Sequence, residues 1–322
     1  MRGLLAMLLA AASLAASAVT AVAGDQRSER WKNWPSSRMP APTAARDVTF
    51  PPYEIRTLAN GLRVVVVAHH EQPAVSMRMI VRAGAAQDPA GKAGLATLMA
   101  SLLDQGTATR TSEQVADTID FVGGALGTGA GTDLSFVNVL VLKDSFDLAL
   151  ELLSEVVRRP AFAPAEIERQ RQQVLSALQV NAQDPDFLAG VAIDRLVYGF
   201  HPYGIPSIGT PDTVASLTRE DILAFHQRWF APNNAILAIV GDLTAEEAFK
   251  GAEKTFGDWE RRDLPAMSFP DPPEPTRRLV LIDRPGAVQT EIRVGNIGIP
   301  RKHPDYDAFD LAVRVLGGEG AN

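Results

Sequence analysis

The chain has 322 residues, a net charge of −7 and no cysteine. This length suits one large or two medium domains. Without cysteine there can be no disulfide, thiolate zinc site, iron–sulfur cluster or catalytic thiol. Lys and Arg form no long basic run, which argues against nucleic-acid binding, because that function requires clustered positive charge to neutralise phosphates.

Residues 1–23 have the pattern of a secretory signal peptide. Arg2 supplies a positive start, residues 4–22 are apolar, and Ala21-Val22-Ala23 is a small-x-small cleavage signal. The alternative is an uncleaved anchor, since the run is near the lower length of a membrane-spanning helix. The alanine content and the cleavage signal favour removal. No later segment is apolar enough to span a bilayer. We therefore expect an exported, periplasmic protein without stable membrane insertion after cleavage.

Residues 24–52 are rich in Pro, Ser, Ala and Arg and show no apolar period, which predicts a flexible leader. Two apolar runs then flank Asn60-Gly61, a strong signal for a β-hairpin. Residues 74–84, "AVSMRMIVRAG", alternate apolar and polar side chains along much of their length, as a half-buried strand does.

The following segments predict helices and two further strands. A short amphipathic helix is expected at 94–107, and a capping box of Thr111 with Gln114 predicts the start of a second helix. Further helices are expected at 145–160, 164–180, 184–199 and 217–230, and strands at 132–142 and 234–243. This order predicts an α+β domain over residues 53–258, in which a mostly antiparallel sheet has helices packed on one face.

The last part of the chain predicts an incomplete unit. Residues 259–276 form a charged, proline-rich linker. Beyond it, "RLVLIDRP" and "TEIRVGNIG" are expected to be strands, and "DYDAFDLAVRVLGG" is expected to be a helix. Two strands and one helix cannot close a domain of their own, so residues 277–322 are expected to be a partial second domain.

Several landmarks run across most of the chain: "NGLRVVVV", "VRAGAAQDPAGKAGLA", "QGTATRT", "GGAL", "RRPAF", "HPYGIPSIGTPDTVASLT" and "RWFAPNNAILAIVGDL". Together they resemble the insulinase/pitrilysin family of zinc peptidases, the inverzincins. The resemblance implies two domains of one fold in a full-length subunit. This chain would hold the first domain and about a quarter of the second.

The resemblance also implies where zinc chemistry would sit. Active members carry His-x-x-Glu-His on the helix at 94–107, and a glutamate from a later helix is the third ligand. Matching the "GT" of the helix exit places Thr97, Ala100 and Ser101 on the His, Glu and His positions, and the later helix places Ala177 on the third ligand. We therefore expect no catalytic or metal-ligating residue at these positions and no cofactor, although active relatives bind zinc.

The chemistry of these side chains supports that expectation without the family. A methyl group cannot bind metal, and serine and threonine hydroxyls are poor zinc ligands at neutral pH. Of the five histidines, His69 and His70 are adjacent in a strand end and point to opposite faces. His226 lies among apolar helix residues and is expected to be structural. His201 is expected to shape a loop, with substrate contact as the alternative.

Two other catalytic or binding patterns are weak. The glycine-rich "GALGTGAGTD" lacks the Gly-Lys-Ser/Thr ending of a phosphate loop and is expected to be a turn entering an edge strand. The resemblance implies that this edge holds extended substrate by strand addition, with Gly127 and Thr128 where active members have an Asn-Ala pair. No Gly-x-Ser-x-Gly elbow surrounds Ser101 or Ser135, which argues against a serine triad.

The loss of all four chemical positions, with the fold landmarks kept, predicts a non-catalytic subunit. In two-chain members of the family, one chain carries the zinc motif and a sister without it closes the chamber around the peptide. The expected partners are therefore a zinc-bearing sister subunit and unfolded peptides, and not nucleic acid. Two alternatives stay open: a zinc-dependent endopeptidase with a rearranged site, and a fragment of a longer peptidase-like protein.

Overall fold

The structure is a computed structural model that describes residues 49–274 and 276–318. The fold described below belongs to the unit of residues 51–322, one of the two into which the chain divides. The predicted signal peptide and nearly all of the predicted leader lie outside the described residues. Within the described part, no helix combines the length and the apolar character that crossing a bilayer requires.

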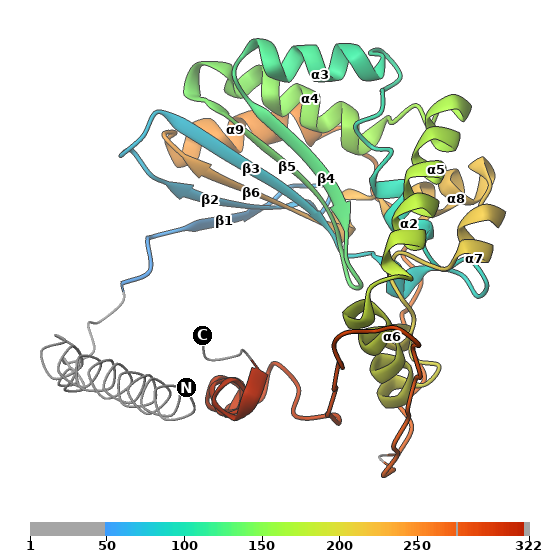
Figure 1. The fold of residues 1–322 in the computed structure, drawn as a ribbon. Coiled ribbons are helices and arrows are strands. Elements are labelled where there is room, and N and C mark those ends of the chain that lie inside the picture. Colours follow the sequence, from blue (N-terminus) through green and yellow to red (C-terminus); the bar gives the residue numbers. More distant parts are fainter. Residues whose placement is uncertain (1–48, 275, 319–322) are drawn as a thin grey trace, which may run out of the picture. The chain divides into compact units, whose positions relative to one another are not determined.

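Six strands form one sheet in the order β1-β2-β6-β3-β5-β4 (Figure 1). The strands are β1 (Glu54–Thr57), β2 (Arg63–Ala68), β3 (Ala74–Val81), β4 (Ala125–Ala130), β5 (Ser135–Leu142) and β6 (Ala235–Gly241). β2 and β6 pair in parallel, and the other neighbours pair antiparallel. The predicted mostly antiparallel sheet is confirmed.

Helices cover one side of this sheet. The helices of the described residues are α2 (Leu95–Ala100), α3 (Ser112–Phe121), α4 (Phe146–Arg158), α5 (Pro164–Asn181), α6 (Pro185–Tyr198), α7 (Pro211–Ser216), α8 (Arg219–Trp229), α9 (Ala245–Phe256) and α10 (Tyr306–Val313), and only some of them cover the sheet. Short turns of other helix types lie at η1 (Ala85–Gln87), η2 (Lys143–Ser145), η3 (Pro202–Gly204), η4 (Pro232–Asn234) and η5 (Arg314–Gly318). α3, α4 and α9 lie on the same side of the sheet in Figure 1, which confirms the predicted helical layer.

The core lies between the sheet and this helical layer. On β3, the residues Val75, Met77, Met79 and Val81 are fully buried and alternate with more exposed ones, because successive side chains of a strand point to opposite faces. α4 and α9 add buried leucine, valine and phenylalanine side chains from the other side of the core. The sheet is therefore amphipathic, with one buried face and one face that the described helices leave open.

Local signals explain most helix starts. Thr111 caps α3 and accepts a hydrogen bond from the backbone N–H of Gln114, as predicted. Thr218 caps α8 in the same way. No element is predicted at α9, yet Thr244 and Glu247 form a capping box there as well. The sequence signal for α9 was present in this box and in the apolar spacing that follows it.

The predicted strands near the C-terminus are wrong. Residues 278–298, named here the C-terminal stretch, form no strand in the described structure, and most of their apolar side chains are exposed. A strand requires hydrogen bonds to a neighbouring strand, and none of the described strands pairs with this stretch. The helix predicted after it is confirmed as α10.

Candidate functional site

α2 carries two of the four positions singled out in the sequence, Thr97 and Ala100, and its C-cap residue Ser101 is the third. The start of α2 is fixed by Asp88. The Asp88 carboxylate accepts hydrogen bonds from the backbone N–H groups of Gly94 and Ala96, each at 2.9 Å. Gly94 has a φ of +94°, and a Cβ there would lie 2.7 Å from the carbonyl oxygen of Ile208. Burial raises the pKa of Asp88 to about 7, against the effect of these hydrogen bonds. The start of the helix is thus held in one place.

The hydroxyls of Thr97, on α2, and of Ser101, at its C-cap, are used for structure. Thr97 Oγ1 donates to the carbonyl oxygen of Ser207 at 2.6 Å, which ties α2 to the loop before α7. Ser101 Oγ donates to the carbonyl oxygen of Leu98 at 2.8 Å, within its own helical turn. Ala100 is fully buried in the core. None of these three side chains leaves a strong ligand atom free.

The structure brings α5 against α2, so the helix that carries Ala177 does pack beside the first three positions. Ala177 itself is exposed and ends in a methyl group. Zinc in proteins takes histidine nitrogen, cysteine sulfur or carboxylate oxygen at about 2.0–2.3 Å. Thr97, Ala100, Ser101 and Ala177 therefore do not fit a zinc ion. Across the described residues, no three His, Asp or Glu side chains gather as a metal site would need.

A polar network that the sequence analysis missed joins the end of α2 to α5. Gln105 donates through Nε2 to Asp104 at 2.6 Å and accepts from Arg169 of α5. Arg169 also pairs with Glu166 at 2.7 Å. Burial raises the pKa of the Asp104 carboxyl. The i,i+3 spacing of Glu166 and Arg169 on α5 was the sequence signal for part of this group.

The edge strand β4 holds the two predicted substrate-binding residues. The glycine-rich segment is itself a strand, rather than a turn that leads into one, and it lies at the end of the sheet order. Gly127 is paired with Asn138, and Thr128 is paired with the buried Val137. Gly127 therefore lies on the open face of the sheet, whereas the Thr128 side chain points to the helical layer. A Cβ on Gly127 would meet no atom within 4 Å.

Two of the histidines, His226 and His201, and the second serine, Ser135, have structural surroundings. His226 is buried and stacks on Phe230, and its Nε2 donates to the carbonyl oxygen of Val157 at 2.8 Å. Burial lowers the pKa of His226 to about 4. His201 Nδ1 accepts from the backbone N–H of Tyr203 at 3.2 Å and shapes its loop, as expected. Ser135 Oγ is buried and donates to a backbone carbonyl.

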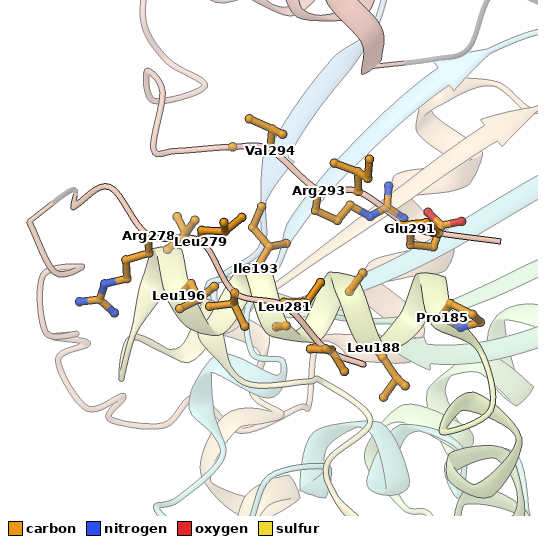
Figure 2. A pocket seen from close by; sticks show the side chains of 18 of the residues that line it. Pro185, Leu188, Ile193, Leu196, Arg278, Leu279, Leu281, Glu291, Arg293 and Val294 are labelled. Atoms are coloured by element: carbon orange, nitrogen blue, oxygen red, sulfur yellow. The ribbon is translucent and has the colours of Figure 1, made fainter. Parts of the chain in front are cut away.

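A cavity of about 600 Å³ lies between α6 and residues 276–297 (Figure 2). Leu188, Ile193 and Leu196 of α6 line one side, and Leu281 of the C-terminal stretch lines the other. Its walls are thus the apolar side chains of a helix together with apolar and charged side chains, among them Arg278 and Glu291, of the stretch that lacks a strand partner. α2 contributes no residue to it.

Comparison with known proteins matches most of the sequence to the models of one family. Residues 63–210 match the family model described as "Insulinase (Peptidase family M16)", and residues 216–322 match "Peptidase M16 inactive domain". An uncharacterized zinc protease of Mycobacterium leprae is 31% identical over 201 residues, which cover 62% of this chain and 45% of the relative. The zinc protease PqqE of Helicobacter pylori is 25% identical over 272 residues, with 83% and 61% covered.

Solved structures share the fold. A peptidase M16 inactive domain from Pseudomonas fluorescens has a TM-score of 0.72 and 28% identity, covering 84% of this chain and 65% of that one. The periplasmic protease PqqL of Escherichia coli has a TM-score of 0.64 at 21% identity, covering 69% and 26%. The chain spans about half the length of the first curated relatives it matches, 45% of one and 50% of another.

Proposed function

Because the chain belongs to the insulinase (M16) family but has Thr97, Ala100, Ser101 and Ala177 at the four positions of its zinc chemistry, we propose that it is a non-catalytic subunit. Its role would be to enclose unfolded peptide for a zinc-bearing sister chain. The sister would supply the metal, the activated water and the hydrolysis. This chain would supply wall surface that excludes water and holds the peptide.

One observation carries the proposal: α2, which spans only Leu95–Ala100 of the helix expected at 94–107, packs against α5, and the side chains at the matched positions offer no zinc ligand. α2 starts on a fixed cap and packs against α5, as a ligand-bearing helix pair must. Thr97 and Ser101 donate their hydroxyl protons to backbone carbonyls. Metal-assisted hydrolysis needs three protein ligands and a base for the water proton, and these side chains provide neither.

Further parts of the proposal concern placement and organisation. The signal-peptide pattern at 1–23 supports export to the periplasm. We propose residues 53–258 as the first domain, 259–276 as a linker and 277–322 as part of a second domain. The open edge of β4 supports peptide binding by strand addition at Gly127 and Thr128.

Reconstitution with a zinc-bearing M16 subunit tests the proposal. We expect the purified chain alone to bind no stoichiometric zinc and to cleave no unfolded peptide, and we expect it to raise the peptidase activity of its sister when the two are mixed. Zinc retained at one per chain, with chelator-sensitive cleavage by this chain alone, would instead establish a peptidase with a rearranged site.

Two variants separate these outcomes. Thr97→Val and Ser101→Ala remove the hydroxyls of these two residues and keep the side-chain volume nearly constant. If the chain is non-catalytic, the stimulation of the sister stays the same in both. If a rearranged site uses these hydroxyls, cleavage by this chain alone disappears in at least one variant.

A further inference from the structure

The face of the sheet that the described helices leave open, named here the open face, is made mainly of apolar and small side chains. The strand register assigns every side chain to one face, since directly opposed residues of paired strands share a face. The residues assigned to the open face are Ile55, Thr57, Arg63, Val65, Val67, Ala74, Ser76, Arg78, Ile80, Ala125, Gly127, Gly129, Phe136, Asn138, Leu140, Leu142, Ile236, Ala238 and Val240. Most of them are apolar or small.

The charges on this face all have one sign. Among the described strand residues, Arg63 and Arg78 are the only charged ones on this face, although the chain has 38 acidic residues and a net charge of −7. The other face differs. There Glu54 lies beside Arg56, and Arg56 pairs with Glu246 of α9 at 2.8 Å. An apolar face with two cations and no carboxylate is thus specific to the open side of the sheet.

Arg78 lies in the middle of this face and is held there by an aromatic ring. It is opposed by Asn138 on β5 and by Ala238 on β6. Its guanidinium lies over the Phe136 ring, 4.8 Å from the centroid. Phe136 in turn lies over Gly129, where a Cβ would come within 2.7 Å of the ring. A guanidinium stacked on a ring keeps its N–H edge free, and that edge matches a carboxylate.

Arg78 makes no ion pair with an acidic side chain of the described residues, and the strand residues around it offer none. Charge complementarity therefore selects the partner: a carboxylate arriving with a ligand. The apolar neighbours Ile80, Val65 and Leu140 select the rest of that ligand, because burial of their exposed surface favours apolar side chains.

We propose that the open face binds extended, mainly apolar peptide segments that carry an acidic residue, with the carboxylate paired to Arg78. This inference rests on the proposed function, because it assigns a peptide class to the wall that the subunit presents. Segments with a basic residue at the same place would meet Arg78 and Arg63 and bind less tightly.

Binding of three matched peptides to the purified full chain tests the inference. The peptides are fluorescent, unstructured 12-residue segments that share one apolar sequence and differ only in a central Glu, Gln or Lys. By fluorescence anisotropy at low salt, we expect the Glu peptide to bind about two- to fivefold more tightly than the Gln peptide, and the Lys peptide to bind most weakly. Added salt at about 0.5 M should shrink these ratios.

Two arginine variants locate the effect. Arg78→Gln should bring the Glu and Gln peptides to equal affinity and leave the affinity of the Gln peptide unchanged. Arg56→Gln is the matched control: Arg56 also lies in this sheet and over a phenylalanine ring, Phe249 at 4.0 Å, but on the helix-covered face. It should leave the Glu-to-Gln ratio as it is.

The outcomes separate this inference from the function it rests on. Equal binding of all three peptides would overturn the acidic preference, and equal effects of the two arginine variants would overturn its assignment to Arg78. Either result would leave a peptide-binding wall in place. Failure of every peptide to bind would overturn both.

Discussion

The sheet and the C-terminal stretch contain similar apolar side chains in very different surroundings. Val64 of β2 and Met77 of β3 are 0% exposed, whereas Leu279 is 97% exposed and Val294 is 93% exposed. The sheet residues have strand neighbours on both sides and a helical layer above them. The stretch has neither among the described residues. Alternating or continuous apolar residues are therefore compatible with a strand, and a strand forms only where another strand accepts its hydrogen bonds.

Hydrogen exchange should show the largest difference between the two regions. Amides of β3 and β6 exchange only on global unfolding if the sheet is one cooperative unit, whereas amides of the C-terminal stretch need almost no opening. We expect protection factors at least about 10³ higher in the sheet, since typical domains are stable by about 5–15 kcal/mol. Equal protection in both regions would show that the stretch has a stable partner.

The second largest difference between the two regions should appear in the free energy of unfolding when one apolar side chain is truncated in each. Phe256 of α9 is fully buried, so Phe256→Ala should lower the free energy of unfolding by about 3–5 kcal/mol. Leu281 in the C-terminal stretch is mostly exposed, so Leu281→Ala should change it by less than about 0.5 kcal/mol. Urea titrations of the two variants measure both values. A large loss for Leu281→Ala would mean that the stretch is packed in solution.

One buried and one exposed histidine, His226 and His303, extend the comparison to the dependence of stability on pH. His226 is buried and its pKa is lowered to about 4, whereas His303 is exposed. Below pH 6.5 the unfolded chain takes up a proton at His226 that the folded chain does not, so the stability is complete above pH 6.5 and falls toward pH 4. The loss is on the order of 3 kcal/mol.

Thermal or urea unfolding between pH 4 and 7 checks this expectation. His226→Phe keeps the aromatic packing and removes the titration. It should lower the stability at pH 7, where the carbonyl of Val157 loses its donor, and should flatten the pH dependence. His303→Gln should follow the parent chain. The assignment fails if the pH dependence is unchanged in His226→Phe.

Local signals in the sequence predict the elements of the sheet domain well. Asn60-Gly61 indicates the β1–β2 hairpin, and Thr111 with Gln114 indicates the start of α3, because both depend on neighbours within a few residues. The same logic could have found α9 from Thr244 and Glu247. The error in the C-terminal stretch has the opposite cause, since strand pairing depends on residues far away in the chain.

In the candidate site, too, the features that depend on local sequence could be predicted and those that depend on distant residues could not. The identities of Thr97, Ala100, Ser101 and Ala177 are visible in the sequence, and so is their inability to bind zinc. Where the Thr97 hydroxyl goes could not be predicted, because Ser207 is 110 residues away. The absence of acidic residues from the strands of the open face could not be predicted without the strand register. Only the register shows that Arg78 and Phe136 lie side by side, away from the helices.

The position of β6 has a consequence for how the domain assembles. β6 is the last of the described strands along the chain, yet it lies between β2 and β3 near the middle of the sheet. Until residues 235–241 have been synthesised and have inserted, β1–β2 and β3–β5–β4 remain two separate ribbons with unsatisfied backbone edges. Closing the sheet requires joining residues about 170 positions apart, which places this fold among those with high contact order and slow folding. Completion of the sheet is therefore a single late event, and the nascent protein has to be protected from aggregation until it occurs.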